Sequence, residues 1–271
     1  MNEIWQALAN EAETAAEQLA VGATALGRAS YAERGYYSQG FFALSVGLER
    51  SCKLILVLDH AVREGSFPCE RTLRRFGHDL SQLLDAADAV AARLQLPEDE
   101  RLPRSPIHEG IVTTLSNFAT NVTRYYNLDV LTGAPGVEER EDPIVEWIRR
   151  VTQPVLERHY TERAERRHLS RAAALDEIAG PYTVVRFFTE DGTSIDSLAA
   201  ASMRSAETEF ARRWERMYVL QLARFLGSLL GELAFRGTAT QEIPHLSEFF
   251  GIFRNSDQYF RERKTWSIRG R

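Results

Sequence analysis

The sequence has little cysteine, little lysine and no long uncharged apolar run. Its two cysteines, Cys52 and Cys69, are too few for a disulfide scaffold or a four-thiolate zinc site, which is typical of a reducing compartment. No apolar run approaches the ~18 residues of a membrane span, and residues 1–4 are acidic where a signal peptide would be basic. We therefore expect a cytoplasmic protein with no membrane partner.

The charge balance restricts the classes of partner. Only Lys53 and Lys264 among the 33 basic residues are lysines, and the net charge is −5. An acidic balance argues against a general non-specific nucleic-acid binder, which would carry a basic excess. The arginine content is typical of codon bias in a GC-rich genome, so it is not by itself evidence for phosphate recognition.

The motifs of the common enzyme classes are missing as well. The six histidines are scattered, with no His-x-x-x-His spacing, and Cys-x-x-Cys does not occur. The phosphate loop, the dinucleotide glycine pattern and the Gly-x-Ser-x-Gly elbow are absent, and neither cysteine has an activating context. We therefore expect no metal and no cofactor, and a conventional metabolic enzyme is the least favoured class.

The spacing of apolar residues predicts an all-α helical bundle of about seven helices. The expected helices cover residues 3–28, 31–62, 77–94, 107–131, 144–155, 197–236 and 243–266. A run of branched and aromatic residues before Asp191-Gly192 predicts a small β-hairpin over 182–196. A linker rich in Gly, Pro and charge over 132–143 divides the chain into an N-terminal lobe, 1–133, and a C-terminal lobe, 143–271.

Two motifs mark the second and third expected helices. The first is Tyr37-x-x-Gly40-x-x-x-Leu44-x-x-x-Leu48-Glu49-x-x-x-Lys53, and the second, after a variable loop, is Gly77-His78-Asp79-Leu80-x-x-Leu83-Leu84. With these motifs, residues 36–94 resemble the helical HEPN superfamily (prokaryotic and eukaryotic nucleotide-binding helical domains). The resemblance covers about a fifth of the chain and implies a HEPN-like core over 31–131.

The four polar residues of these motifs also have structural interpretations. Glu49 and Lys53 are either a buried functional pair or an i,i+4 pair that stabilises the helix by ~0.2–0.5 kcal/mol. Asp79, followed three residues later by Gln82, has the form of a capping box, and His78 belongs to the same helix start.

Many HEPN proteins are metal-independent RNases, and their resemblance-implied signature is an Arg, often followed by a polar residue, with a His four to six residues beyond the Arg. Near the C-terminus this chain has Arg254 and Asn255, but Tyr259 stands where the histidine is wanted. A phenol with a pKa of ~10 is a poor base near pH 7. The RNase signature is therefore degenerate, or Arg254 has another role. Loose matches elsewhere, Arg71 with His78 and Arg163 with His168, are no more frequent than chance predicts.

Basic stretches form the remaining candidate surface. The nucleic-acid candidates are Arg163, Arg166, Arg167, Arg171, Arg261 and Arg263. They form either a surface that binds RNA or DNA, or a solvent-exposed helix stabilised by ion pairs such as Glu162–Arg166. The run Arg124-Tyr125-Tyr126 is either a nucleotide pocket or part of the core.

These observations leave three functions open. We expect a HEPN-like protein of prokaryotic defence or stress response that binds RNA, a nucleotide or a protein partner encoded nearby, without catalysis. One alternative is a metal-independent endoribonuclease that uses Arg254 and Asn255 in a dimeric site. The other is a purely structural partner subunit of a toxin–antitoxin or anti-phage system. The aromatic last helix, over 243–266, favours a homodimer.

Overall fold

The computed structural model describes residues 3–120, 122–238 and 243–268 of the chain. Helices make up 74% of it, and the one sheet among the described residues has two strands, which confirms the all-α fold class with a small hairpin. The hairpin is smaller than expected. Its strands β1 (Phe187–Phe188) and β2 (Ser194–Ile195) pair antiparallel around the turn at Gly192.

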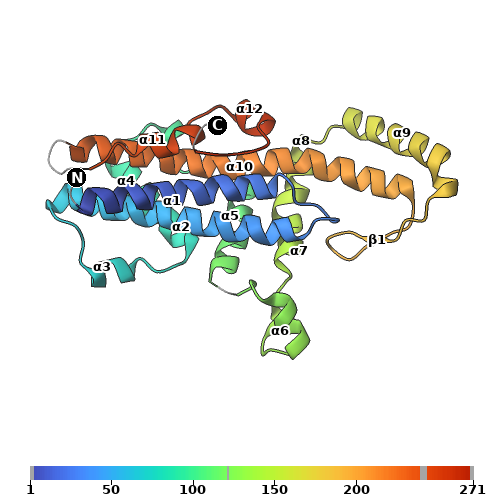
Figure 1. Cartoon of the computed structure of the whole chain (residues 1–271), viewed down its shortest axis with the longest axis horizontal. Coiled ribbons are helices and arrows are strands. Elements are labelled where there is room, and N and C mark those ends of the chain that lie inside the picture. The colour runs from blue at the N-terminus through green and yellow to red at the C-terminus, as the bar shows by residue number, and fades with distance from the viewer. Residues whose placement is uncertain (1–2, 121, 239–242, 269–271) are drawn as a thin grey trace.

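Three long helices form the centre of the bundle and lie side by side (Figure 1). They are α1 (Glu3–Leu26), α2 (Gly35–Glu64) and α10 (Leu198–Thr238). α1 and α2 approach closely because glycines line their contact. A Cβ at Gly22 would lie 2.5 Å from Leu44 Cγ, and one at Gly47 would lie 2.9 Å from the backbone nitrogen of Leu19.

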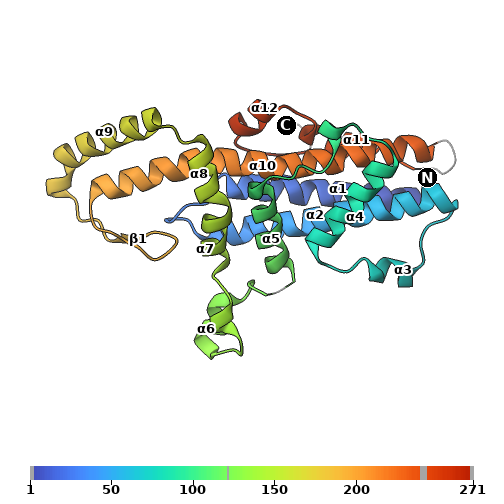
Figure 2. The same ribbon diagram turned by 180° about the vertical axis from the view of Figure 1, so that it is seen from behind.

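Shorter elements surround these three helices. On the side seen in Figure 2, the bundle is covered by α4 (Leu80–Arg93), α5 (Pro106–Ala119), α7 (Pro143–Trp147) and α8 (Gln153–His159). Along the top of the bundle in Figures 1 and 2, α11 (Ser247–Phe250) and α12 (Asp257–Glu262) pack on α10. The elements that project from the bundle are α3 (Glu70–Arg75), α6 (Tyr126–Thr132) and α9 (Glu162–Ala179). α9 runs beside the far end of α10, opposite the N-terminus (Figure 1).

The helix expected over 144–155 is present, but one of its turns is wide. α7 and α8 are joined through a π-helical turn, η3 (Ile148–Thr152), in which the Gln153 amide donates to the Ile148 carbonyl five residues back. The next residue, Pro154, has no amide to donate, and its ring cannot follow a regular α-turn. The wide turn therefore lets one helix continue through a proline.

Two expected helices are wrong because polar residues interrupt them. The helix expected over 107–131 stops at Ala119, where the Thr120 hydroxyl bonds to the Ser116 carbonyl at 2.9 Å, and the chain turns before α6 begins. The helix expected over 243–266 is divided into α11, a 3₁₀ turn η5 (Gly251–Phe253) and α12. Here the Asn255 side chain bonds to the Ile252 carbonyl, and Ser256 caps the new helix start. Such side chains compete with the helical backbone for hydrogen bonds.

This interruption also removes the aromatic face on which the homodimer was expected. Phe250, Phe253 and Phe260 are fully buried in the core of their own chain, and Phe249 and Tyr259 are half-buried against it. The segment therefore presents no continuous aromatic stripe to a second copy. The homodimer therefore stays a prediction that needs another surface.

The two expected lobes share one hydrophobic core. A single cluster of buried side chains contains Leu44 and Leu84 from residues 1–133 together with Trp147 and Leu226 from 143–271. The linker over 132–143 lies between two parts of this core rather than between two separate cores. Of the described helices, one stretch of α10, Leu198–Gly237, is long and apolar enough to cross a membrane, and 67% of its most apolar window is buried inside the protein. That burial is typical of the central helix of a bundle.

Candidate nucleic-acid interface

Basic side chains from three separate helices line two adjoining cavities on the far half of α10. The inner cavity, of about 480 Å³, is lined by Gly27, Glu209, Phe210, Arg212, Arg213, Trp214, Arg216, Gln258, Arg261, Glu262 and Lys264. The outer cavity, of about 530 Å³, is lined by Arg167, His168, Arg171, Ser202, Ser205, Ala206, Glu209, Phe210 and Arg213. Because they share Glu209, Phe210 and Arg213, we call them together the arginine groove.

The packing of α9 and α12 on α10 builds the groove from segments that lie far apart in the sequence. The Asp176 carboxylate, near the end of α9, accepts from the Ala199 amide at the start of α10, so the two helices are tied together where the chain turns back. At α12, the Arg216 guanidinium of α10 donates to the carbonyls of Phe260 and Arg261 at 3.1 and 2.8 Å. These carbonyls belong to the last turn of α12, where helical partners are lacking.

Positive charge dominates the inner cavity. Its five cations face two carboxylates, Glu209 and Glu262. Glu209 is paired with Arg213 at 2.5 Å, and this hydrogen bond lowers the pKa of Glu209. Arg216 is only 2% exposed. Its burial, followed by the nearby charges of Arg212 and Arg213, lowers the pKa of Arg216 to about 10. The guanidinium remains charged near neutral pH.

Aromatic rings form the other wall of the inner cavity. The His159 ring stacks on Trp214 with 3.6 Å between ring centroids and 6° between planes. The Arg261 guanidinium carbon lies 4.4 Å from the centre of the Trp214 ring, a distance typical of a cation–π contact. Two neighbours therefore cover this indole. Phe210 is half-buried, lines both cavities and is the aromatic ring best placed to meet a ligand.

The outer cavity combines a histidine with arginines. His168 Nδ1 lies 2.6 Å from the Tyr160 hydroxyl. Partial burial, followed by the charges of Arg167 and Arg171, lowers the pKa of His168, so the ring is mainly neutral near pH 7. A cavity with three arginines, a neutral histidine and two serines provides donors suited to phosphate and sugar oxygens.

The structure brings together some of the expected nucleic-acid residues and leaves others outside. Arg167, Arg171 and Arg261 line the groove. Arg163 and Arg166 are exposed on α9 but do not line either cavity, and Arg166 lies 3.9 Å from Glu162, as the interpretation as a solvent-exposed helix expects. The remaining candidate, Arg263, lies over the rings of Tyr259 and Trp266 instead.

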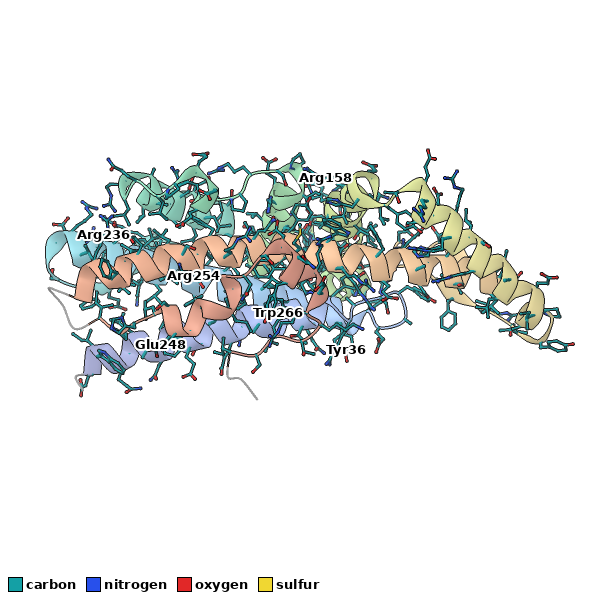
Figure 3. The ribbon with its side chains drawn as sticks, turned by 90° about the horizontal axis from the view of Figure 1, so that it is seen from above. Tyr36, Arg158, Arg236, Glu248, Arg254 and Trp266 are labelled. Carbon is teal, nitrogen blue, oxygen red and sulfur yellow. The ribbon has the colours of Figure 1, made fainter. Side chains whose placement is uncertain are left out.

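The three residues of the expected RNase signature do not share a site. Arg254 lines a separate cavity of about 520 Å³ with Arg236 and His245, and lies beside α10 in Figure 3. The carbonyl of Asn255 accepts from Arg224 at 3.0 Å, and the Tyr259 hydroxyl bonds to the Arg263 guanidinium. The resemblance requires the signature on one helix, but Arg254 and Asn255 precede α12 and Tyr259 lies within it.

The residues that carry the HEPN resemblance connect α2 to α4. Glu49 bonds to Lys53 at 2.8 Å and to His78 at 2.9 Å, while Asp79 accepts from the amides of Ser81 and Gln82 as the cap of α4. The cap and the i,i+4 pair are therefore formed as expected. These contacts fix the start of α4 against α2, and none of the four motif residues lines the arginine groove.

The run at 124–126 lies outside the arginine groove. The Arg124 guanidinium lies over Phe42 and Phe118, at 5.3 and 5.5 Å from the ring centroids. Tyr125 is 55% exposed, so it does not belong to the core either. Within the described ranges, no group of three or more His, Cys, Asp or Glu side chains could hold a metal ion.

Sequence reasoning missed the centre of the groove. Arg212, Arg213 and Arg216 lie within a long apolar pattern, which favoured a core helix, although three arginines within five residues were a visible signal. Comparison of the chain with protein-family models, curated proteins and solved structures finds no match. The HEPN resemblance therefore stays a prediction.

Proposed function

We propose that this protein binds single-stranded RNA along the arginine groove without cleaving it, as a HEPN-like protein of prokaryotic defence or stress response. One observation carries the proposal. Arginines from α9, α10 and α12 converge on one face around Phe210, although the chain as a whole is acidic. A local basic surface attracts phosphates even when the net charge is negative.

The mixture of arginines and a half-buried aromatic ring favours single-stranded RNA over a duplex. Unpaired bases stack on aromatic side chains and on guanidinium planes, whereas the grooves of a duplex hide the base faces. Phe210 lies between the two cavities, so a strand that follows the groove passes this ring. Ser202 and Ser205 of the outer cavity add donors for sugar oxygens.

Salt dependence of binding tests the proposal directly. We expect a fluorescently labelled single-stranded RNA to bind at low salt, with an affinity that falls linearly with the logarithm of the salt concentration. The slope should be about −2 to −4, because each phosphate contact contributes about −0.7 for single strands. Fluorescence anisotropy measures this slope. Failure to bind at low salt, or binding that salt does not weaken, contradicts the proposal.

We expect no RNA cleavage in EDTA. Arg254 and Tyr259 lie in different surroundings, and Tyr259 is held by Arg263. His168 is the one described histidine that lines the groove, so it is the residue to test beside Arg254. Gel electrophoresis of end-labelled RNA incubated with the protein measures cleavage. Metal-free cleavage that disappears in Arg254→Ala or His168→Ala would replace our proposal with the endoribonuclease alternative.

A second candidate function, assembly through the exposed end of the molecule, is favoured by apolar side chains in the segment 178–188. Ile178 is 75% exposed, Val184 84% and Phe188 67%. Single exposed apolar residues are ordinary, but a concentration of them marks an interaction surface. We propose that a second copy of the chain covers this segment, since paired identical surfaces are the commonest oligomer symmetry.

Light scattering tests this assembly. We expect twice the chain mass of 30.7 kDa at micromolar concentration and a return to the single-chain mass in the double variant Ile178→Ser, Phe188→Ser. The control is Leu131→Ser on α6, where an apolar residue is 81% exposed away from this segment. A single-chain mass for the unaltered protein overturns the homodimer and favours a different protein as the partner of the segment.

A further inference from the structure

The floor of the inner cavity is a buried guanidinium beside a glycine. Arg216 uses Nε and Nη2 on the carbonyls of α12. Its remaining nitrogen, Nη1, faces Gly27 at the end of α1, where a Cβ would lie only 2.7 Å away. Because both residues line the cavity and Arg216 is 2% exposed, the charge lies at the bottom of the space rather than at its rim.

The cations of the inner cavity outnumber the groups that could neutralise them. Arg212, Arg216, Arg261 and Lys264 form no ion pair with a carboxylate in the described part of the chain, and the buried Nε of Arg261 has no hydrogen-bond partner there. The two carboxylates of the cavity are too few to neutralise its five cations. Glu209 pairs with Arg213, and Glu262 accepts from Gln258 at 2.9 Å. Of these four cations only Arg216 is buried. A buried charge without an ionic partner is costly, so this guanidinium favours an anion in the cavity.

We propose that the inner cavity binds a terminal phosphate monoester, such as the phosphate at the end of an RNA strand or of a mononucleotide. The proposal rests on the proposed function, in which RNA lies along the groove, and it assigns the end of the strand to the inner cavity. A phosphate monoester carries close to two negative charges at pH 7, with three oxygens that accept hydrogen bonds. An internal phosphodiester carries one charge and is flanked by two sugars.

The arrangement of the cavity supports a strand end over an internal phosphate. An internal phosphate needs an open path on both sides, whereas Arg216 lies at a closed floor formed by the ends of α1 and α12. A volume of about 480 Å³ suits a phosphate with its attached nucleoside. The strand would then leave past Phe210 into the outer cavity, which shares that ring.

One substitution can displace the Arg216 guanidinium from the floor of the cavity without removing its charge. In Gly27→Ala, the new Cβ would collide with the Arg216 Nη1 and displace the guanidinium end. Gly27 has no positive φ, so alanine is compatible with its backbone. The matched control is Gly35→Ala at the start of α2, where a Cβ would meet nothing within 4 Å.

The test compares two RNAs of identical sequence, one with a 5′-phosphate and one with a 5′-hydroxyl, on the full chain by fluorescence anisotropy. We expect the phosphorylated RNA to bind about tenfold more tightly, because its terminal phosphate adds charge-assisted hydrogen bonds that the 5′-hydroxyl cannot make. The preference should disappear in Gly27→Ala and persist in Gly35→Ala. Calorimetric titration with adenosine monophosphate and with inorganic phosphate, at constant ionic strength, distinguishes a nucleotide from free phosphate.

Each outcome decides between the two proposals. Equal affinity for the two RNAs overturns the terminal-phosphate site and leaves RNA binding in place. A preference that survives in Gly27→Ala overturns the assignment to the floor at Arg216. If neither RNA binds, the proposed function fails, and heat released by inorganic phosphate in the unaltered protein but not in Gly27→Ala still supports the anion site.

Discussion

Reversing the charge of Arg212 and Arg213 is expected to weaken RNA binding about a hundredfold at low salt. Both residues line the inner cavity, and Arg213 also lines the outer one. A hydrogen bond to a charged group contributes ~1.5–3 kcal/mol, so two lost phosphate contacts correspond to about two factors of ten. The double variant Arg212→Glu, Arg213→Glu is measured by anisotropy with the same labelled RNA.

A second pair of arginines provides the matched control for this experiment. Arg71 and Arg75 on α3 are exposed, and α3 lies at the other end of the molecule from α9 (Figure 2). Arg71→Glu, Arg75→Glu changes the net charge by the same amount, so it reproduces any general electrostatic effect. An equal loss of affinity in both double variants would mean that RNA recognises the overall charge and that the groove has no special role. Circular dichroism checks that both variants keep the helical fold.

Acidification is expected to destabilise the protein by about 3 kcal/mol through His108 alone. Burial, the largest cause, lowers the pKa of His108 to about 4 from its ordinary 6.5. Between these two values the unfolded chain binds a proton that the folded chain does not. The contribution of His108 is therefore complete above pH 6.5 and is lost as the pH falls through 4.

Hydrogen bonds define the neutral form of this histidine. The amide oxygen of Gln221 can only accept, so His108 Nε2 donates to it at 2.9 Å. Nδ1 then accepts from the Ser105 hydroxyl at 2.8 Å, and the Tyr218 ring meets the imidazole edge-on at 5.1 Å between centroids. A proton added at Nδ1 would require the Ser105 hydroxyl to rotate and would place a charge on a side chain that is only 6% exposed.

Urea unfolding at pH 7 and pH 4 measures this effect when wild type is compared with His108→Gln. The variant should lose less stability between the two pH values, because it has no ring to protonate. Glu215 acts in the opposite direction, since burial raises its pKa and its contribution falls as the pH rises. Its effect is common to both proteins and cancels in the comparison. An identical pH dependence in the two proteins would show that His108 does not carry the acid sensitivity.

The long helices and their caps could be predicted because local periodicity and side-chain chemistry determine them. The expected ranges 3–28 and 31–62 correspond to α1 and α2, and Asp79 caps α4 as its sequence indicates. The interruptions near Thr120 and Asn255 could not be predicted from periodicity, because the apolar pattern continues on both sides of each. At these two points, single side-chain hydrogen bonds decide between a continuous helix and a turn.

The groove was harder to predict because it depends on contacts between distant segments. The sequence gives no means of knowing that α9 folds back along α10 or that the end of α12 lies on Arg216. Of the basic residues on α9, Arg167 and Arg171 are one turn apart and share the side that faces the outer cavity. Net charge along the sequence cannot distinguish these residues from Arg163, which is exposed and outside the groove.

The close glycine contact between α1 and α2 has a consequence for the order in which the chain folds. These helices are neighbours in the sequence and are joined by residues 27–34, so their contact closes only a short loop. α10 begins at Leu198, and its contacts with α2 must wait for a much longer loop to close. During synthesis the α1–α2 pair can therefore form early, with the apolar face that α10 later covers still open to solvent. We expect this interval to be the point at which the nascent chain depends most on chaperones.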